Sequence, residues 1–185
     1  MKDKLAIFDL DGTLFDTRKV NYGAYKKALN QYGSDIDYGY FSDRCNGNHY
    51  KVFLPEIMGS SQYIEQVHSL KKKYYKEFLK EAIENRHLFQ IIEGIRGRYY
   101  IALVTTASRE NCEEILTSYG RIQMFDLIIT QEDVEKKKPD PEGFLLAMER
   151  CKVGREDTII FEDSKAGLRA AERCGATVFA ALGYA

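Results

Sequence analysis

The sequence is poor in the residues that build disulfide frameworks and zinc sites, with four cysteines and three histidines among 185 residues. The cysteines are far apart and form no Cys-x-x-Cys pair, so we expect them to be reduced thiols, as in a cytoplasmic protein. The histidines are equally scattered, which argues against a zinc site.

Three further absences exclude whole classes of protein. No run of about 18 apolar residues is present, so the sequence predicts no membrane-spanning helix. The apolar run over residues 5–8 is too short for a signal peptide, and no small-residue cleavage site follows it. Lysine and arginine number 27 against 28 aspartates and glutamates, a net charge of −1, so nothing predicts binding to nucleic acid or to a membrane. The oligomeric state is left open.

The composition is that of an ordinary globular protein. Hydrophobic residues make up 44% of the chain and charged residues 30%. A chain of this length buries roughly 70% of the surface that it exposes when unfolded, so it needs no disulfide or structural metal. The length indicates one domain, or one domain that carries an insertion.

Short apolar runs alternate with helical periodicity in the second half of the chain. The apolar runs cover 99–104, 125–129, 158–161 and 177–180, and the helical stretches between them cover 109–119, 141–151 and 165–174. Strands and helices that alternate at this spacing, together with the run at 5–8, predict an α/β fold with a doubly wound parallel sheet.

A long helical segment interrupts this alternation. Roughly ninety residues separate the first two strands, far more than a normal crossover contains. Helical periodicity covers 16–33 and 61–86, and 34–50 is a turn-rich connector. We therefore predict that residues 15–86 form an inserted helical domain and that residues 1–14 and 87–185 form the α/β core.

Two carboxylates at the end of the first strand give the sharpest chemical signal. Asp9 and Asp11 are expected to point into the crevice at the carboxyl edge of the sheet, where such folds bind ligands. Like charges this close are costly unless a cation or a proton lies between them. Gly12 allows a close backbone approach, and Thr13 can bond turn amides. Taken alone, the pattern fits an Asp-Gly turn with solvated carboxylates equally well.

Four segments, in order, resemble the motifs of the haloacid dehalogenase superfamily of phosphotransferases. The first is Asp9-Leu10-Asp11-Gly12-Thr13-Leu14, and Thr105, after the second strand, matches the second motif. Lys138 matches the third, and Glu162-Asp163-Ser164, followed by Gly167, matches the fourth. The inserted domain is similar to the small cap of the family's first cap class. The resemblance covers nearly the whole chain and implies a Rossmann-like core with a helical cap.

The resemblance implies phosphoryl transfer through Asp9. This side chain would be the nucleophile that forms an aspartyl-phosphate. Asp11 would protonate the leaving oxygen and then deprotonate the attacking water. Thr105 and Lys138 would offer a hydroxyl and a positive charge to the phosphoryl oxygens. Taken singly, Thr105 fits a helix cap, and the lysine fits a solvated run at 136–138.

The resemblance also implies a magnesium site. A carboxylate attacks a phosphate dianion only if a metal screens their repulsion, and hard Mg²⁺ prefers oxygen ligands. Asp9, the backbone carbonyl of Asp11 and Asp163 would hold the ion, and Glu162 would orient Asp163 or a metal-bound water. Thr106, by contrast, is expected to cap the helix that follows it.

These roles predict a Mg²⁺-dependent phosphatase that acts on a small phosphorylated metabolite. Asp11 favours phosphoester chemistry, because similar enzymes that dehalogenate or cleave phosphonates lack this carboxylate. A sugar phosphomutase similar to β-phosphoglucomutase is the alternative, although such mutases carry a histidine where this chain has Asn21. A non-catalytic binding module is a third hypothesis, disfavoured because no motif residue is lost.

A turn in the inserted domain lies where similar proteins place a glycine-containing specificity loop. Its polar residues are predicted to contact the leaving group, with the glycine allowing a close approach: Arg44, Asn46, Gly47, Asn48 and His49. The inserted domain is expected to close over the site and select the substrate. The alternative is a helix–helix connector whose asparagines and glycine serve only the turn.

Overall fold

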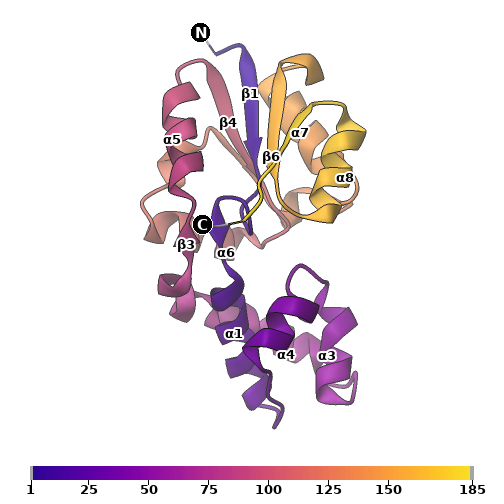
Figure 1. Cartoon of the computed structure of the whole chain (residues 1–185). Helices are drawn as coiled ribbons and strands as arrows, with labels where there is room; N and C mark the ends of the chain where they lie inside the picture. Colours follow the sequence, from indigo (N-terminus) through magenta and orange to yellow (C-terminus); the bar gives the residue numbers. More distant parts are fainter. Residues whose placement is uncertain (1, 184–185) are drawn as a thin grey trace. The chain divides into compact units, whose positions relative to one another are not determined.

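The apolar runs of the sequence become parallel strands in the computed structural model, which describes residues 2–183. The chain divides into two units with separate hydrophobic cores. The core unit contains the chain up to Asp16 and from Ile83 onward, and the inserted unit is Thr17–Ala82 (Figure 1).

The core unit contains a five-stranded sheet in the order β5-β4-β1-β6-β7, and all neighbouring strands are parallel. The strands are β1 (Lys4–Phe8), β4 (Tyr99–Val104), β5 (Leu127–Ile129), β6 (Thr158–Glu162) and β7 (Thr177–Ala180). In the central strand, Phe8 is paired with Leu103 on one side and Phe161 on the other. The register therefore brings the carboxyl ends of β1, β4 and β6 to the same edge.

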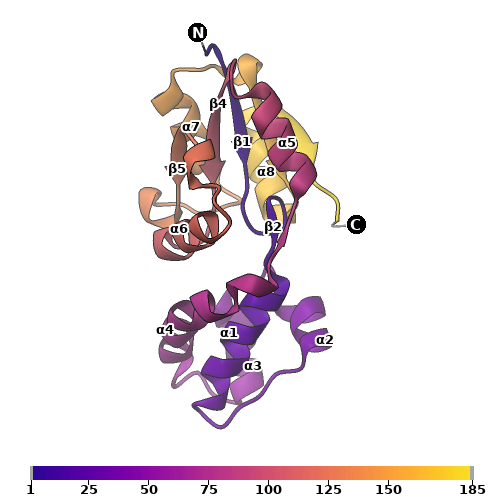
Figure 2. The same ribbon diagram turned by 90° about the vertical axis from the view of Figure 1, so that its left-hand side faces the viewer.

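Helices cover both faces of this sheet. They are α5 (Arg86–Ile95), α6 (Arg109–Ser118), α7 (Glu142–Cys151) and α8 (Lys165–Cys174), with 3-10 turns η3 (Ile122–Met124), η4 (Gln131–Asp133) and η5 (Arg155–Asp157). The buried side chains of α7 and α8, such as Phe144 and Ala171, pack with Ile7 and Ile160 of the strands. Helix α5 lies on the opposite side of the sheet (Figures 1 and 2). The predicted doubly wound α/β fold is confirmed.

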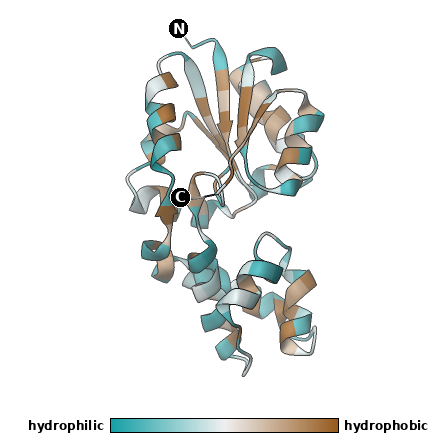
Figure 3. Cartoon of the chain, in the orientation of Figure 1, coloured by the Kyte–Doolittle hydropathy of each residue, from teal (hydrophilic) through white to brown (hydrophobic). Residues whose placement is uncertain are grey.

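The strands are hydrophobic because helices cover both faces of the sheet. Every residue from Leu5 to Phe8 and from Ile101 to Val104 is buried, and continuous apolar runs are typical of such strands. Figure 3 shows hydrophobic segments on the strands and alternating hydrophilic and hydrophobic segments on the helices. Helices α6 and α8 begin at polar caps: the side chains of Ser108 and Ser164 accept hydrogen bonds from their first turns.

The inserted unit is helical and has an aromatic core. Its elements are α1 (Arg18–Asn30), α2 (Tyr38–Tyr40), a π-helical turn η1 (Phe41–Cys45), α3 (Tyr50–Met58), α4 (Ile64–Tyr74) and the 3-10 segment η2 (Tyr75–Glu81). Tyr25, Phe41 and Phe53 are buried together, with ring centroids 5.2–6.5 Å apart. Three of the 13 tyrosines and ten phenylalanines of the sequence thus meet at the centre of this unit.

The two connections between the units pair with each other. Strand β2 (Phe15–Asp16) is antiparallel to β3 (Ile83–Glu84), and both belong to the core unit. The predicted boundaries, 14/15 and 86/87, assign these strands to the insertion instead. The predicted helix over 61–86 is wrong at its end, because the helical segments stop at Glu81 and β3 follows. Within residues 2–183, no helix combines the length and hydrophobicity that a membrane crossing requires.

Candidate active site

The carboxyl ends of three adjacent strands bring the predicted motif residues of the core unit together. Asp9 follows β1, and its backbone N–H donates to the carbonyl of Phe161 in β6 at 3.0 Å. Thr105 follows β4, and Asp163 follows β6. This edge is where open α/β sheets bind ligands. The site is therefore built on the rigid centre of the sheet.

The Lys138 ammonium lies between two buried carboxylates. Its Nζ is 2.6 Å from Oδ1 of Asp9 and 2.6 Å from Oε2 of Glu162, and it also donates to the Val104 carbonyl at 3.0 Å. The side chains of Lys138 and Asp9 are each 9% exposed, and that of Glu162 is fully buried. A buried charge is stable only when it is paired and hydrogen-bonded, and these contacts meet that requirement.

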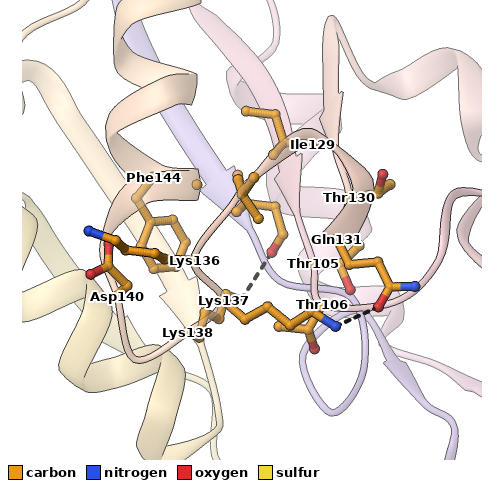
Figure 4. A pocket seen from close by; sticks show the side chains of 13 residues that line it. Thr105, Thr106, Ile129, Thr130, Gln131, Lys136, Lys137, Lys138, Asp140 and Phe144 are labelled. Atoms are coloured by element: carbon orange, nitrogen blue, oxygen red, sulfur yellow. Dashed lines mark hydrogen bonds between the residues drawn. The ribbon is translucent and has the colours of Figure 1, made fainter.

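The other two lysines of the predicted run do not enter this network. Lys136 and Lys137 are exposed, and Nζ of Lys137 donates to the side chain of Gln131 at 2.9 Å. Figure 4 shows Lys137 and Lys138 on the wall of a pocket that Thr105 and Phe144 also line. Lys138 alone among the three reaches Asp9, so the solvated-run interpretation holds only for its neighbours.

Glu162 positions the residues around it. While its Oε2 accepts from Lys138, its Oε1 accepts from the backbone N–H groups of Asp163 and Ser164 at 3.1 and 3.0 Å and from the Ser164 hydroxyl at 2.9 Å. Gly167 leaves room for this carboxylate, because a Cβ there would lie 2.0 Å from Cδ of Glu162. Both carboxylate oxygens are thus occupied by protein donors.

Asp163 is held by the loop that follows β1. The Thr13 hydroxyl donates to Oδ1 of Asp163 at 2.9 Å, a contact more specific than the predicted bonds to turn amides. Gly12 has φ +94°, and a Cβ there would lie 2.1 Å from Oδ2 of Asp163. Asp11, between Asp9 and Gly12, is half-buried, and its backbone forms an isolated bridge with Phe15.

The electrostatics of the cluster fit a hard divalent cation. Among the described residues, Asp9, Glu162 and Asp163 form a cluster of three carboxylates, each with one oxygen within 4.8 Å of the oxygens of the other two. When all are ionised, the Lys138 ammonium offsets one of three negative charges and leaves two. Oxygen donors are what Mg²⁺ prefers. Because Glu162 is fully hydrogen-bonded, Asp9 and Asp163 are the carboxylates that suit direct coordination.

The pKa values of the side chains in the cluster reflect both their burial and its excess of negative charge. Burial raises the pKa of Asp9 well above its usual range, and the charge of Glu162 adds to the rise while Lys138 opposes it. Burial and then Glu162 raise the pKa of Asp163 to about 6. For Lys138, burial lowers the pKa, but Asp9 and Glu162 outweigh it and the pKa is raised. The lysine therefore stays charged, and a further cation beside Asp9 and Asp163 would favour the ionised form of both carboxylates.

After β4, Thr105 is placed as predicted, but the helix cap is not the residue that we expected. The side chain of Thr105 is buried, and its Oγ1 accepts from the Ala107 N–H at 3.0 Å, so its own hydrogen is available to donate. Ser108, not Thr106, is the N-cap of α6, and Thr106 is exposed. The expectation that Thr106 caps this helix is wrong, because α6 begins only at Arg109 and the residue directly before it is Ser108.

The predicted specificity loop lies in the inserted unit, and its five residues are exposed: Arg44, Asn46, Gly47, Asn48 and His49. Nδ2 of Asn48 donates to the Arg44 carbonyl at 2.8 Å, and Nδ1 of His49 caps α3 by accepting from the Lys51 N–H at 3.3 Å. Gly47 has φ +78°, so the turn needs a glycine there. Two of these side chains thus have local structural contacts, as a connector would require.

A substitution at Gly12 tests the packing of this loop against Asp163. Gly12→Ala places a Cβ on the Asp163 carboxylate, so we expect the carboxylate to move away from Asp9 and the rise in melting temperature with added Mg²⁺ to disappear. Gly120→Ala is the matched control in the same unit, because Gly120 has φ +66° with nothing within 4 Å of the added Cβ. It should lose about 1–2 kcal/mol to backbone strain alone and keep the Mg²⁺ response. If the melting temperatures of the two variants rose equally with Mg²⁺, close packing of Gly12 against the Asp163 carboxylate would not be needed for the metal site.

Comparison with known proteins identifies the family to which the chain belongs. A family model described as haloacid dehalogenase-like hydrolase matches residues 6–181. The validoxylamine A 7'-phosphate phosphatase of Streptomyces hygroscopicus subsp. limoneus is 29% identical over 93% of this chain and 82% of its own. The phosphorylated carbohydrates phosphatase of Thermotoga maritima is 32% identical over 91% of this chain and 80% of its own.

Solved structures show the same fold. The crystal structure of β-phosphoglucomutase from Clostridium difficile superimposes with a TM-score of 0.76 at 25% identity, and the match covers 96% of this chain and 83% of that one. Fold, motif geometry and a family match over nearly the whole chain agree: the chain belongs to the haloacid dehalogenase-like hydrolases and is an enzyme of that family.

Proposed function

We propose that this enzyme is a Mg²⁺-dependent phosphatase that hydrolyses small phosphorylated carbohydrates through an aspartyl-phosphate on Asp9. The observation that carries the proposal is the buried cluster in which Lys138 pairs with Asp9 and Glu162 beside Asp163. The substrate class rests on the two relatives above, whose names specify a sugar-like phosphate and phosphorylated carbohydrates. That the four cysteines are free supports a cytoplasmic enzyme.

The chemistry divides into two displacements at phosphorus. In the first, an Asp9 oxygen forms a bond to phosphorus as the bond to the sugar oxygen breaks, and Asp11 gives its proton to that oxygen. In the second, water attacks phosphorus and gives a proton to Asp11, and inorganic phosphate leaves as Asp9 is regenerated. Bound Mg²⁺ would supply the charge that lets a carboxylate approach a phosphate dianion.

The remaining residues of the core unit hold charge and position in both steps. Lys138 keeps an ammonium beside the nucleophile, where it attracts the phosphoryl oxygens and stabilises their transition-state charge. Thr105 offers its hydroxyl hydrogen to the same oxygens. Asp9 and Asp163, with the carbonyl of Asp11, would hold the metal ion, and Glu162 orients Asp163 through its backbone N–H.

A phosphomutase is the second candidate, favoured by the similarity to the β-phosphoglucomutase structure. In that reaction the phosphoryl group returns to a reoriented sugar instead of to water. Similar mutases have a histidine at the position of Asn21, and here Nδ2 of Asn21 donates to the Thr17 hydroxyl at 3.1 Å. An amide side chain, unlike an imidazole, cannot act as a general acid or base near neutral pH, so we favour hydrolysis. A binding module without activity is disfavoured because Asp9, Asp11, Lys138 and Asp163 are all present.

Asp9→Asn tests the nucleophile. The change removes the attacking oxyanion and one ligand oxygen at almost constant side-chain volume, so we expect the protein to fold and turnover to fall by several orders of magnitude. The measurement is release of inorganic phosphate from a phosphorylated sugar and from 4-nitrophenyl phosphate, with EDTA as a second control. If a tenth of the wild-type rate survived in this variant, a covalent intermediate on Asp9 would be excluded.

The Mg²⁺ site predicts a pH-dependent stabilisation. The pKa of Asp163 is raised from 3.8 to about 6, so the metal-free protein loses stability from this group as pH rises through that range. Mg²⁺ must displace the proton, so the rise in melting temperature with Mg²⁺ should be large at about pH 7.5 and small at about pH 5. Asp163→Ala should abolish the rise at both pH values, with KCl at equal ionic strength as the control. An unchanged Mg²⁺ response in Asp163→Ala would remove this residue from the ligand set.

We also propose that the exposed loop at 44–49 contributes to the choice of substrate. Asn48→Ala and His49→Ala should each lower kcat/KM for the phosphorylated sugar by an amount equivalent to about 1–3 kcal/mol, as for a lost polar contact. Turnover of 4-nitrophenyl phosphate should barely change. Asp37→Ala is the matched control, because it removes only the cap of α2 in the same unit. Equal losses on both substrates, or in the control, would assign the loop to structure alone.

A further inference from the structure

Asn85 uses its side chain and its backbone to join the start of α5 to the catalytic loop. Its Oδ1 accepts from the Leu88 N–H at 3.3 Å and so caps α5. Its Nδ2 donates to the Thr13 carbonyl at 3.1 Å, and its backbone N–H donates to the Leu14 carbonyl at 2.8 Å. One half-buried residue thus satisfies a helix end and two carbonyls of the loop after β1.

The loop segment that Asn85 holds is the one that orients Asp163. Thr13 accepts from Asn85 through its carbonyl and donates from its hydroxyl to Oδ1 of Asp163 at 2.9 Å. The side chain of Thr13 is fully buried, so a shift of its backbone moves the hydroxyl with it. A continuous chain of hydrogen bonds therefore runs from Asn85 through Thr13 to Asp163.

The surroundings of Asn85 are fixed independently of the cluster. The preceding residue, Glu84, pairs with Phe15 across the β2–β3 ladder and receives a hydrogen bond from Nε of Arg121 at 2.5 Å. Phe15 is fully buried, and its ring lies 5.5 Å from that of Phe89 in α5. The segments before and after Asn85 are thus both packed against Phe15, and the two hydrogen bonds of the side chain set the direction of its amide group.

We propose that Asn85 is a positioning residue of the active site, whose amide holds Thr13 so that the Thr13 hydroxyl keeps the Asp163 carboxylate facing Asp9. The inference deepens the proposed function, on which it rests. A simple helix cap needs only the side-chain oxygen of an asparagine. The bond from Nδ2 to the Thr13 carbonyl is the additional feature, and it links the cap to the predicted metal ligand.

Two substitutions at Asn85 separate the cap from the positioning contact. Asn85→Ser keeps a hydroxyl oxygen that caps α5 nearly as well as the amide, but its shorter side chain has no second polar atom in the place of Nδ2, which donates to the Thr13 carbonyl. Asn85→Ala loses both. Asn30→Ser, at an exposed position in α1, is the control for the residue change. Mg²⁺ affinity of the intact protein is measured by isothermal titration calorimetry without substrate, and melting temperature is measured in parallel.

We expect Asn85→Ser and Asn85→Ala to weaken Mg²⁺ binding equally, by about tenfold. This is the lower end of the loss expected when a metal ligand loses its hydrogen-bond partner, because Asn85 acts on Asp163 only through Thr13. Only Asn85→Ala should show the fall in melting temperature that follows from the loss of a helix cap. The Mg²⁺ concentration that half-saturates phosphatase activity should rise in step, with kcat at saturating Mg²⁺ nearly unchanged. Asn30→Ser should match the wild type in every measurement.

A double-mutant cycle tests the route through Thr13. Thr13→Val removes the hydroxyl at nearly constant volume, so Asn85→Ser should weaken Mg²⁺ binding no further in that background. Additive losses would overturn the route, and wild-type Mg²⁺ affinity in Asn85→Ser would overturn the positioning role. A wild type that binds Mg²⁺ but releases no phosphate would instead refute the proposed function and leave the comparison of affinities valid.

Discussion

The pairing of one buried ammonium with two buried carboxylates is the interaction on which the rest of the site depends. Lys138 links the ends of three strands, because it bonds Asp9 after β1, Glu162 of β6 and the Val104 carbonyl of β4. Removing one partner of such a pair costs about 3–5 kcal/mol, because the other charge stays buried without compensation. Lys138, the sheet register and both carboxylates thus stabilise one another in the folded protein.

The arrangement also depends on two positions at which the chain has no side chain. A methyl group at Gly12 or Gly167 would collide with a carboxylate of the site, that of Asp163 in the first case and that of Glu162 in the second. Each carboxylate therefore fits against a stretch of bare backbone. The same loop that needs Gly12 supplies the Thr13 hydroxyl to Asp163, so sterics and hydrogen bonding fix this carboxylate from two directions.

Sequence patterns predicted the sheet and the residues at its edge because both depend on local regularities. The buried strands are continuous apolar runs, and Asp9 and Asp163 each follow one directly. The patterns failed where tertiary contacts decide. Helical periodicity continues past Glu81, yet pairing with Phe15 draws Ile83–Glu84 into a strand. No spacing rule reveals that Thr13 meets Asp163 across 150 residues. Asn85 could have been suspected as a cap, but not as a neighbour of the catalytic loop.

The antiparallel pair of β2 and β3 gives the insertion a particular relation to the rest of the chain. Phe15 and Asp16 leave the core beside Glu84 and Ile83, which return to it. The pair is therefore a β-hairpin in which a folded unit, Thr17–Ala82, replaces the turn. Insertion at such a point leaves the sheet register unaltered, because the two ends of the inserted segment are already adjacent. Exchange of the whole unit for another, or for a two-residue turn, would leave the contacts among the residues at the end of β1 in place, because their partners belong to the core unit.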